Sequence, residues 1–128
     1  MARILVIDDE PGVRAAMEVL LTTAGHAVTL AKDGREGVAK SGAGTFDLVI
    51  VDLFMPGTDG IETIRALRMN VADLPILAIS GYAARGTFKS PDYLDIATKL
   101  GASSSLAKPF RPQQLLDAVE ACLADARN

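Results

Sequence analysis

The sequence predicts an α/β protein, with a doubly wound, five-stranded parallel sheet that helices cover on both faces. Short unbroken apolar runs, typical of strands buried on both sides, alternate five times with segments of helical periodicity. Such alternation gives a parallel sheet, because right-handed crossovers return the chain to the same edge. The 128 residues, 49% of them hydrophobic, suit one domain spanning 1–128 and leave no room for a second.

The first two strand–helix units occupy the first third of the chain. Residues 4–7 form the first apolar run, and Pro11 suits the first position of the following helix. Apolar residues recur there at helical spacing until Gly25 closes the helix. Residues 27–31 predict a second strand, and residues 34–43 a helix weakened by two internal glycines.

The third unit begins with an apolar strand over residues 46–51. We expect a tight loop at residues 55–57, directly after that strand. Asp59 and Glu62 have capping-box spacing and predict the start of the third helix.

The last two units follow the same pattern. Residues 74–79 predict the fourth strand, and Ser90–Pro91 predicts a cap and first turn for a helix that ends at Gly101. Residues 103–107 predict a fifth strand despite three serines of low β-propensity, and Pro112 opens the last helix.

Composition narrows the class of function. The net charge of −3 and the scattered basic residues argue against nucleic-acid binding by this chain. No apolar run approaches the roughly 20 residues of a membrane span, so we expect no membrane contact. Met1 leads directly into a strand, so we expect no signal peptide and a cytoplasmic location. We expect Cys122 to be a buried apolar residue and His26 to be structural.

Carboxylates follow two of the predicted strands directly. Asp8 and Asp9 follow the first strand, and Asp52 follows the third. Ligands of open α/β sheets bind at the carboxyl ends of the strands, so neighbouring strands would crowd these groups into one pocket. Crowded carboxylates take up a proton or bind a cation, and a set without Cys or His favours Mg²⁺ over zinc.

A hydroxyl and an ammonium follow the fourth and fifth strands. Ser80 ends the fourth strand and Lys108 follows the fifth. A lysine and a serine can bind a phosphoryl group, an aspartate can accept one, and a metal would neutralise its charge. Any one of these positions alone would be explained as a helix cap or a turn, but all five at successive strand ends are hard to explain that way.

As a set, these motifs resemble the receiver domain of two-component response regulators, the CheY-like family. The matching segments lie along the whole chain: residues 8–9, residues 52–57 with 59–60, residues 80–81 and residues 108–110. The resemblance implies the flavodoxin-like strand order 2-1-3-4-5. It also implies a phosphorylation switch rather than a classical enzyme, with only self-phosphorylation from a phosphodonor and slow autodephosphorylation.

The resemblance also assigns roles to the acidic residues. Asp52 resembles the phosphoacceptor aspartate of this family. That aspartate receives its phosphoryl group from a phosphohistidine of a histidine kinase or phosphotransfer protein. Asp9, Asp52 and the backbone carbonyl of Phe54 resemble direct ligands of Mg²⁺ (or Mn²⁺), and Asp8 resembles a ligand acting through water.

In the same family a lysine contacts the phosphoryl group and a hydroxyl moves toward it, roles that fall here on Lys108 and Ser80. The peptide bond between Lys108 and Pro109 is cis in such proteins. Phe54 and Tyr82 occupy positions that border the phosphoryl group, and their bulk predicts slow hydrolysis of the aspartyl phosphate.

Two departures from the family concern the output of the switch. Ser105 stands where an aromatic residue usually lies, and the loop at 81–89 is longer than usual.

A phosphoacceptor switch acting on a downstream protein effector is the main interpretation. The alternatives are a receiver-like interaction module independent of phosphorylation and a receiver fragment of a longer regulator. A nucleotide- or flavin-binding protein is less supported, since no Gly-rich loop follows the first strand.

Overall fold

The computed structural model describes residues 1–55, 58–80 and 101–127. The predicted helix from Ser90 to Gly101, most of which falls at 90–100, the long loop at 81–89 and Tyr82 lie outside the described residues. Within those ranges, no helix has the length and apolar character needed to cross a membrane.

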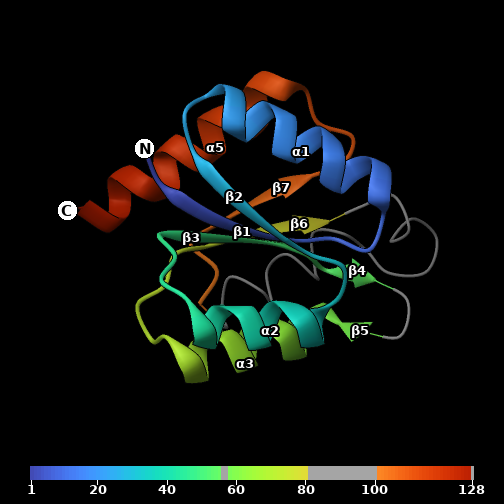
Figure 1. Ribbon diagram of the computed structural model, residues 1–128, viewed down its shortest axis with the longest axis vertical. Helices are drawn as coiled ribbons and strands as arrows, with labels where there is room; N and C mark the ends of the chain where they lie inside the picture. The colour runs from blue at the N-terminus through green and yellow to red at the C-terminus, as the bar shows by residue number, and fades with distance from the viewer. Residues whose placement is uncertain (56–57, 81–100, 128) are drawn as a thin grey trace.

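The described strands form a five-stranded parallel sheet in the order β2-β1-β3-β6-β7 (Figure 1). Counted along the chain, this is the predicted order 2-1-3-4-5. The strands are β1 (Arg3–Ile7), β2 (Ala27–Ala31), β3 (Leu48–Asp52), β6 (Ile76–Ser80) and β7 (Ser104–Ala107).

Two strands begin two residues later than predicted. β3 begins at Leu48, and the preceding Asp47 binds the start of β1: its carboxylate accepts the Arg3 N–H at 2.8 Å and its own N–H donates to the Arg3 carbonyl at 2.7 Å. β6 begins after Pro75, which has no N–H to contribute to the sheet. The predicted strands over 46–51 and 74–79 were therefore wrong at their amino ends and one residue short at their carboxyl ends.

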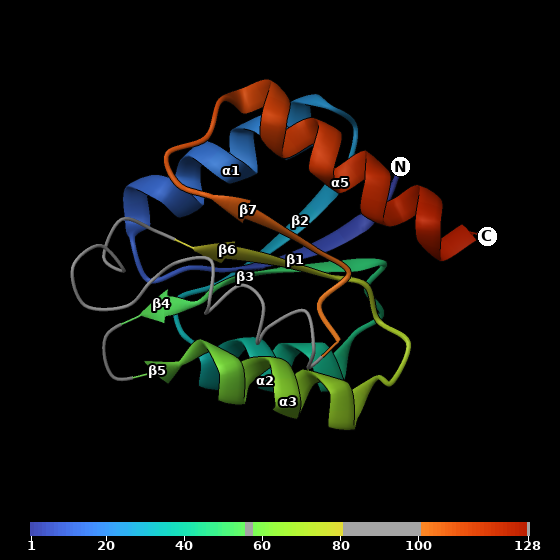
Figure 2. The ribbon, with the colours of Figure 1, turned by 180° about the vertical axis from the view of Figure 1, so that it is seen from behind.

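Helices cover both faces of the sheet, as predicted. Helices α1 (Pro11–Thr23) and α5 (Pro112–Arg127) lie on one face, and α2 (Gly34–Ala43) and α3 (Gly60–Asn70) on the other (Figures 1 and 2). The glycine-containing α2 is stabilised by a cap that the sequence analysis missed. The Asp33 carboxylate accepts the Glu36 N–H at 2.8 Å.

The core has two layers, one on each side of the sheet. Alternate strand residues point to opposite faces, so a run with a core on both sides must be apolar throughout. Leu5 and Val49 pack toward one layer, while Ile4 and Ile50 pack toward the other, and all four are fully buried.

Cys122 is 1% exposed and packs in the layer beneath α1 and α5, which confirms that it is a buried apolar residue. Burial and the charge of Asp125 raise the pKa of its thiol. His26 is also buried, and its Nδ1 accepts the Ala2 N–H at 3.1 Å, which is the structural role expected.

The segment after β3 was predicted only as a tight loop and contains a small hairpin. β4 (Phe54–Met55) pairs antiparallel with β5 (Thr58–Asp59), and α3 begins at the next residue. Gly60 lies against the backbone of Leu53, where an added Cβ would stand 2.5 Å from the Leu53 Cα. The close approach of α3 to the end of β3 therefore requires glycine.

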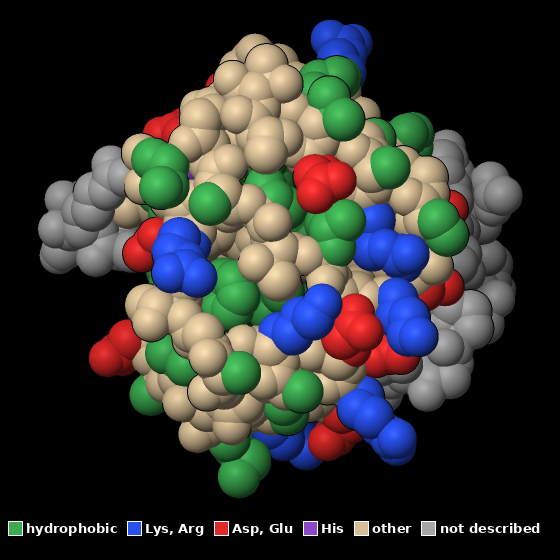
Figure 3. Space-filling model, in the orientation of Figure 1, with side chains coloured by type: hydrophobic (Ala, Val, Ile, Leu, Met, Phe, Trp, Pro, Cys, Tyr) green, Lys and Arg blue, Asp and Glu red, His purple; other side chains and the backbone are tan. Residues whose placement is uncertain are grey.

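Charged side chains of both signs lie beside one another on the face shown in Figure 3. This agrees with the scattered basic residues of the sequence. The net charge is −3, and this face carries no concentrated basic patch.

Candidate functional site

The sheet register brings the predicted site residues to one edge. Ile7 lies opposite Val51, so Asp8 and Asp52, each one residue further along, end neighbouring strands. Ser80 lies opposite Ala107, so the next residue in the chain, Lys108, extends past the same edge. The predicted convergence of strand-end residues is therefore confirmed for these positions.

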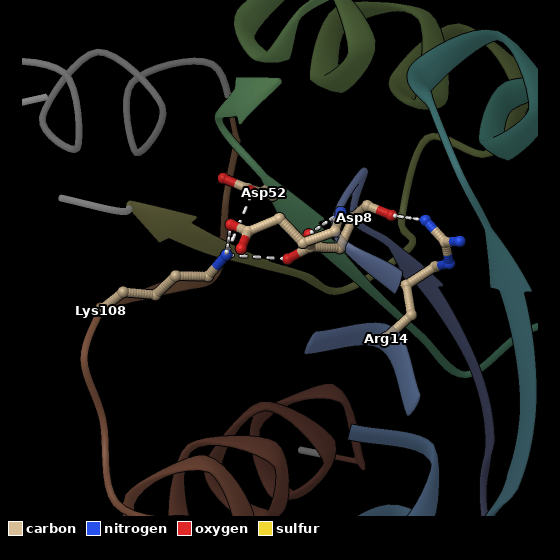
Figure 4. Close-up of polar contacts among 5 residues, drawn as sticks. Asp8, Arg14, Asp52 and Lys108 are labelled. Carbon is tan, nitrogen blue, oxygen red and sulfur yellow. Dashed lines mark hydrogen bonds and ion pairs between the residues drawn. The ribbon is translucent and has the colours of Figure 1, made fainter. Parts of the chain in front are cut away.

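Lys108 joins the two most deeply buried carboxylates of the site. Its Nζ lies 2.9 Å from Asp8 Oδ2 and 3.1 Å from Asp52 Oδ2 (Figure 4). Asp8 is fully buried and Asp52 is 2% exposed. Burial lowers the pKa of Lys108, but hydrogen bonds and charges of Asp8 and Asp52 outweigh burial and raise it. The ammonium is therefore charged at neutral pH and compensates part of the acidic charge.

The acidic cluster is larger than these two groups. Carboxylate oxygens of Asp8, Asp9, Glu10 and Asp52 lie within 4.8 Å of one another. Burial, followed by repulsion from Asp8, raises the pKa of Asp9. The cluster thus holds more negative charge than Lys108 compensates. An all-oxygen set without His or Cys fits a hard cation such as Mg²⁺.

Glu10 was not predicted as part of the site. Its side chain is 63% exposed, and its Oε1 lies 3.7 Å from Lys108 Nζ. Its position directly after Asp9 was the available signal. Asp8 and Asp9 directly follow a predicted strand, which indicates a site. An exposed glutamate before a helix is common and indicates none.

Hydrogen bonds fix the connection between β1 and α1. The Asp8 N–H donates to the Ala31 carbonyl at 3.1 Å, and the Glu10 N–H donates to Asp8 Oδ1 at 2.9 Å. Arg14, in the first turn of α1, donates from Nη1 to the Asp8 carbonyl at 2.6 Å (Figure 4). The sequence analysis missed Arg14, because its partner is a backbone oxygen that no side-chain motif reveals.

Two more predicted site residues lie at or just beyond strand ends. Phe54 begins β4, two residues after Asp52, and Ser80 is the last residue of β6. The peptide bond between Lys108 and Pro109 is cis, as the family resemblance implied. The roles of the Phe54 carbonyl and the Ser80 hydroxyl stay predictions. Ser105 is exposed on β7, opposite Ala78.

Comparison with known proteins gives a consistent set of similarities. The family model for the response regulator receiver domain matches residues 4–120. Response regulator MprA of Mycolicibacterium vanbaalenii is 38% identical over 121 residues, covering 94% of this chain and 50% of that protein. Transcriptional regulatory protein ResD of Bacillus subtilis is 32% identical over 124 residues, covering 97% and 49%.

The chain thus spans about half the length of these two curated relatives. Among solved structures, the chemotaxis protein CheY4 of Vibrio cholerae superposes with a TM-score of 0.85 at 35% identity. That similarity covers 96% of this chain and 99% of CheY4. The likeness therefore extends over nearly the full length of both chains.

Proposed function

The chain belongs to the response regulator receiver domain family of two-component systems, and from this premise we propose that residues 1–128 act as a phosphoacceptor switch. The phosphoryl group comes from a phosphohistidine of a histidine kinase or histidine phosphotransfer protein. The output is a change in binding to a downstream protein effector. We place this function in the cytoplasm, without nucleic-acid or membrane binding by this chain.

The observation that carries the proposal is the ammonium of Lys108 between two buried carboxylates at the sheet edge. A structural salt bridge needs one carboxylate, whereas this site gathers four acidic residues around one lysine. Clustered carboxylates repel, so their retention in one place is costly unless a cation or a transferring group uses them.

Asp52 is the nucleophile of the proposed reaction. A carboxylate oxygen of Asp52 attacks the phosphorus of the donor, the P–O bond forms, and the P–N bond to the imidazole breaks. The imidazole, already protonated at its other ring nitrogen, takes the electron pair of the P–N bond and leaves as neutral histidine. Lys108, already within 3.1 Å of Asp52, stays close enough to bind an oxygen of the transferred group.

A divalent cation, Mg²⁺ or Mn²⁺, would be held by Asp9, Asp52 and the Phe54 carbonyl, with Asp8 acting through water. When bound, it would neutralise negative charge on the phosphoryl oxygens. This charge would favour the ionised form of Asp9, whose pKa burial and Asp8 raise in the free site.

Ser80 would donate its hydroxyl to a phosphoryl oxygen, so phosphorylation would change the position of the end of β6.

We propose that Phe54 and Tyr82 slow hydrolysis of the aspartyl phosphate by excluding water. Replacing either with a small polar residue, such as Phe54→Asn, should speed loss of phosphate after removal of the donor. An unchanged decay rate in both variants would contradict this role.

The test of the proposal is incubation with a small phosphodonor and Mg²⁺, followed by intact-protein mass spectrometry. We expect a gain of one phosphoryl group that disappears in Asp52→Ala. Asp117→Ala, at a carboxylate on α5 that binds only Gln113 among the described hydrogen bonds, is the matched control and should be phosphorylated normally. Equal phosphorylation of Asp52→Ala, or none of the unaltered chain, would refute the proposal.

The alternative is a receiver-like module that binds its partner without phosphorylation. The exposed Ser105, where the family usually has an aromatic residue, favours it, because that residue normally links the site to the binding face. Partner binding that is equal before and after phosphorylation would support this alternative.

A further inference from the structure

Arg14 completes hydrogen bonding at the end of β1. β2 ends at Ala31, whose carbonyl accepts the Asp8 N–H. The Asp8 carbonyl therefore lies beyond the last paired residue of β2 and has no strand partner there. The Arg14 guanidinium donates to this oxygen at 2.6 Å. This bond replaces the hydrogen bond that a further residue of β2 would have made.

This bond fixes Asp8 from the side opposite the lysine. Figure 4 shows Arg14 and Lys108 on opposite sides of Asp8. The two Asp8 side-chain oxygens bind Lys108 and the Glu10 N–H, and the two backbone groups bind Ala31 and Arg14. Every polar group of Asp8 thus has a partner, and the direction in which the chain continues to Asp9 is determined.

Asp9 needs such a constraint. Its carboxylate oxygen lies within 4.8 Å of carboxylate oxygens of Asp8, Glu10 and Asp52, so acidic side chains crowd it there. A β1–α1 connection free to rotate at Asp8 would move the Asp9 carboxylate toward water. We propose that Arg14 is a positioning residue that holds this connection so that Asp9 stays within the divalent-cation site. The inference rests on the proposed function.

A purely electrostatic role and a positioning role of Arg14 predict opposite changes in Mg²⁺ affinity when Arg14 is replaced. A cation near an acidic cluster repels Mg²⁺, so loss of charge alone would tighten Mg²⁺ binding. Loss of a hydrogen bond that orients a ligand weakens metal binding, typically about 10–100-fold. The direction of the change therefore separates a positioning role from a purely electrostatic one.

The experiment compares Mg²⁺ affinity by isothermal titration calorimetry in Arg14→Met and Arg14→Lys. We expect Arg14→Met to raise the Kd about tenfold, the lower end for outer-shell partners, because Arg14 acts through the backbone. Arg14→Lys keeps a charged donor and should restore most of the affinity. Arg65→Met is the matched control, because, within the described part of the chain, Arg65 pairs only with Glu62 on the surface of α3.

Two further measurements separate positioning from a loss of stability. Amide exchange of Glu10, whose N–H binds Asp8 Oδ1, should accelerate in Arg14→Met but not in Arg65→Met. The rate of phosphorylation from a small phosphodonor should match the unaltered chain at saturating Mg²⁺ and fall only at low Mg²⁺. If Arg14→Met does not fold, Arg14→Gln, which is shorter and uncharged, carries the same expectations.

Unchanged or tighter Mg²⁺ binding by the uncharged variant would overturn the positioning role. If the unaltered chain still gained phosphate on Asp52, the proposed function would survive that result. Failure of the unaltered chain to bind Mg²⁺ would overturn both.

Discussion

Replacing Lys108 with methionine should destabilise the protein more than any surface charge substitution. The ammonium lies 2.9 and 3.1 Å from two carboxylate oxygens, and its side chain is 14% exposed. Methionine keeps the length of the side chain but leaves the buried carboxylates of Asp8 and Asp52 without this cation. The perturbation therefore removes charge compensation with little change in packing.

Removing one partner of a buried ion pair costs about 3–5 kcal/mol, because the other charge stays buried and uncompensated. Lys108 retains some contact with water, so we expect about 3 kcal/mol, at the lower end. For a chain of this size that loss lowers the Tm by roughly 10 °C. Because Mg²⁺ would supply replacement positive charge, the loss should be smaller when Mg²⁺ is saturating.

The pH dependence of this destabilisation shows whether the lost charge of Lys108 is its cause. The pKa of Lys108 is raised in the folded chain, so its stabilisation is complete below the unfolded lysine pKa of about 10.4. That stabilisation is lost as the pH rises through the higher folded value. The difference between the unaltered chain and Lys108→Met should thus stay constant from about pH 6 to 9 and shrink above about pH 10.4.

The assay is urea unfolding without divalent cations, followed by circular dichroism, with Arg65→Met as control. The control breaks an exposed pair with Glu62 and should cost less than about 1 kcal/mol. A loss in Lys108→Met no larger than in the control would refute the view that this lysine compensates buried charge.

Three further substitutions, at Asp9, Gly60 and Asp33, have expected effects that thermal or urea unfolding measures. Asp9→Asn should raise the Tm at pH 7 without Mg²⁺, because burial and Asp8 raise the pKa of Asp9 and disfavour its ionised form. That gain should vanish below about pH 4, where the aspartate is protonated in both states; a lower Tm at pH 7 would contradict it. Gly60→Ala should cost about 2–3 kcal/mol, because its Cβ would meet the Leu53 backbone, whereas Gly12→Ala, in open space on α1, should not destabilise. Comparable losses in the two glycine variants would contradict the close approach at Leu53. Asp33→Ala should cost about 1 kcal/mol through loss of the α2 cap, and an unchanged urea midpoint would show that the cap is dispensable.

Much of the sheet could be predicted from the sequence, because a strand with a core on both faces must be apolar at every position. The runs ending at Ile7 and near Asp52 satisfy this condition and are fully buried. Strand ends were harder to predict. Asp47 binds Arg3 through both its side chain and its backbone although β3 begins at Leu48, and such contacts between distant residues are encoded by no local pattern.

The same distinction applies to the site. Residues that directly follow strands, such as Asp8 and Lys108, could be predicted to meet because parallel strands share an edge. Arg14 acts on a backbone oxygen six residues away in the chain, and Glu10 stands among exposed polar residues. Neither has a signature in residue type, and only the path of the β1–α1 connection reveals them.

Of the clustered carboxylates, we propose that Asp52 alone accepts a phosphoryl group. Treating the phosphorylated chain with borohydride reduces an aspartyl phosphate to homoserine, and peptide mass spectrometry then locates the altered residue. We expect homoserine at position 52 and aspartate retained at positions 8 and 9. Homoserine at either of those positions, or no homoserine in a chain that has gained phosphate, would contradict it.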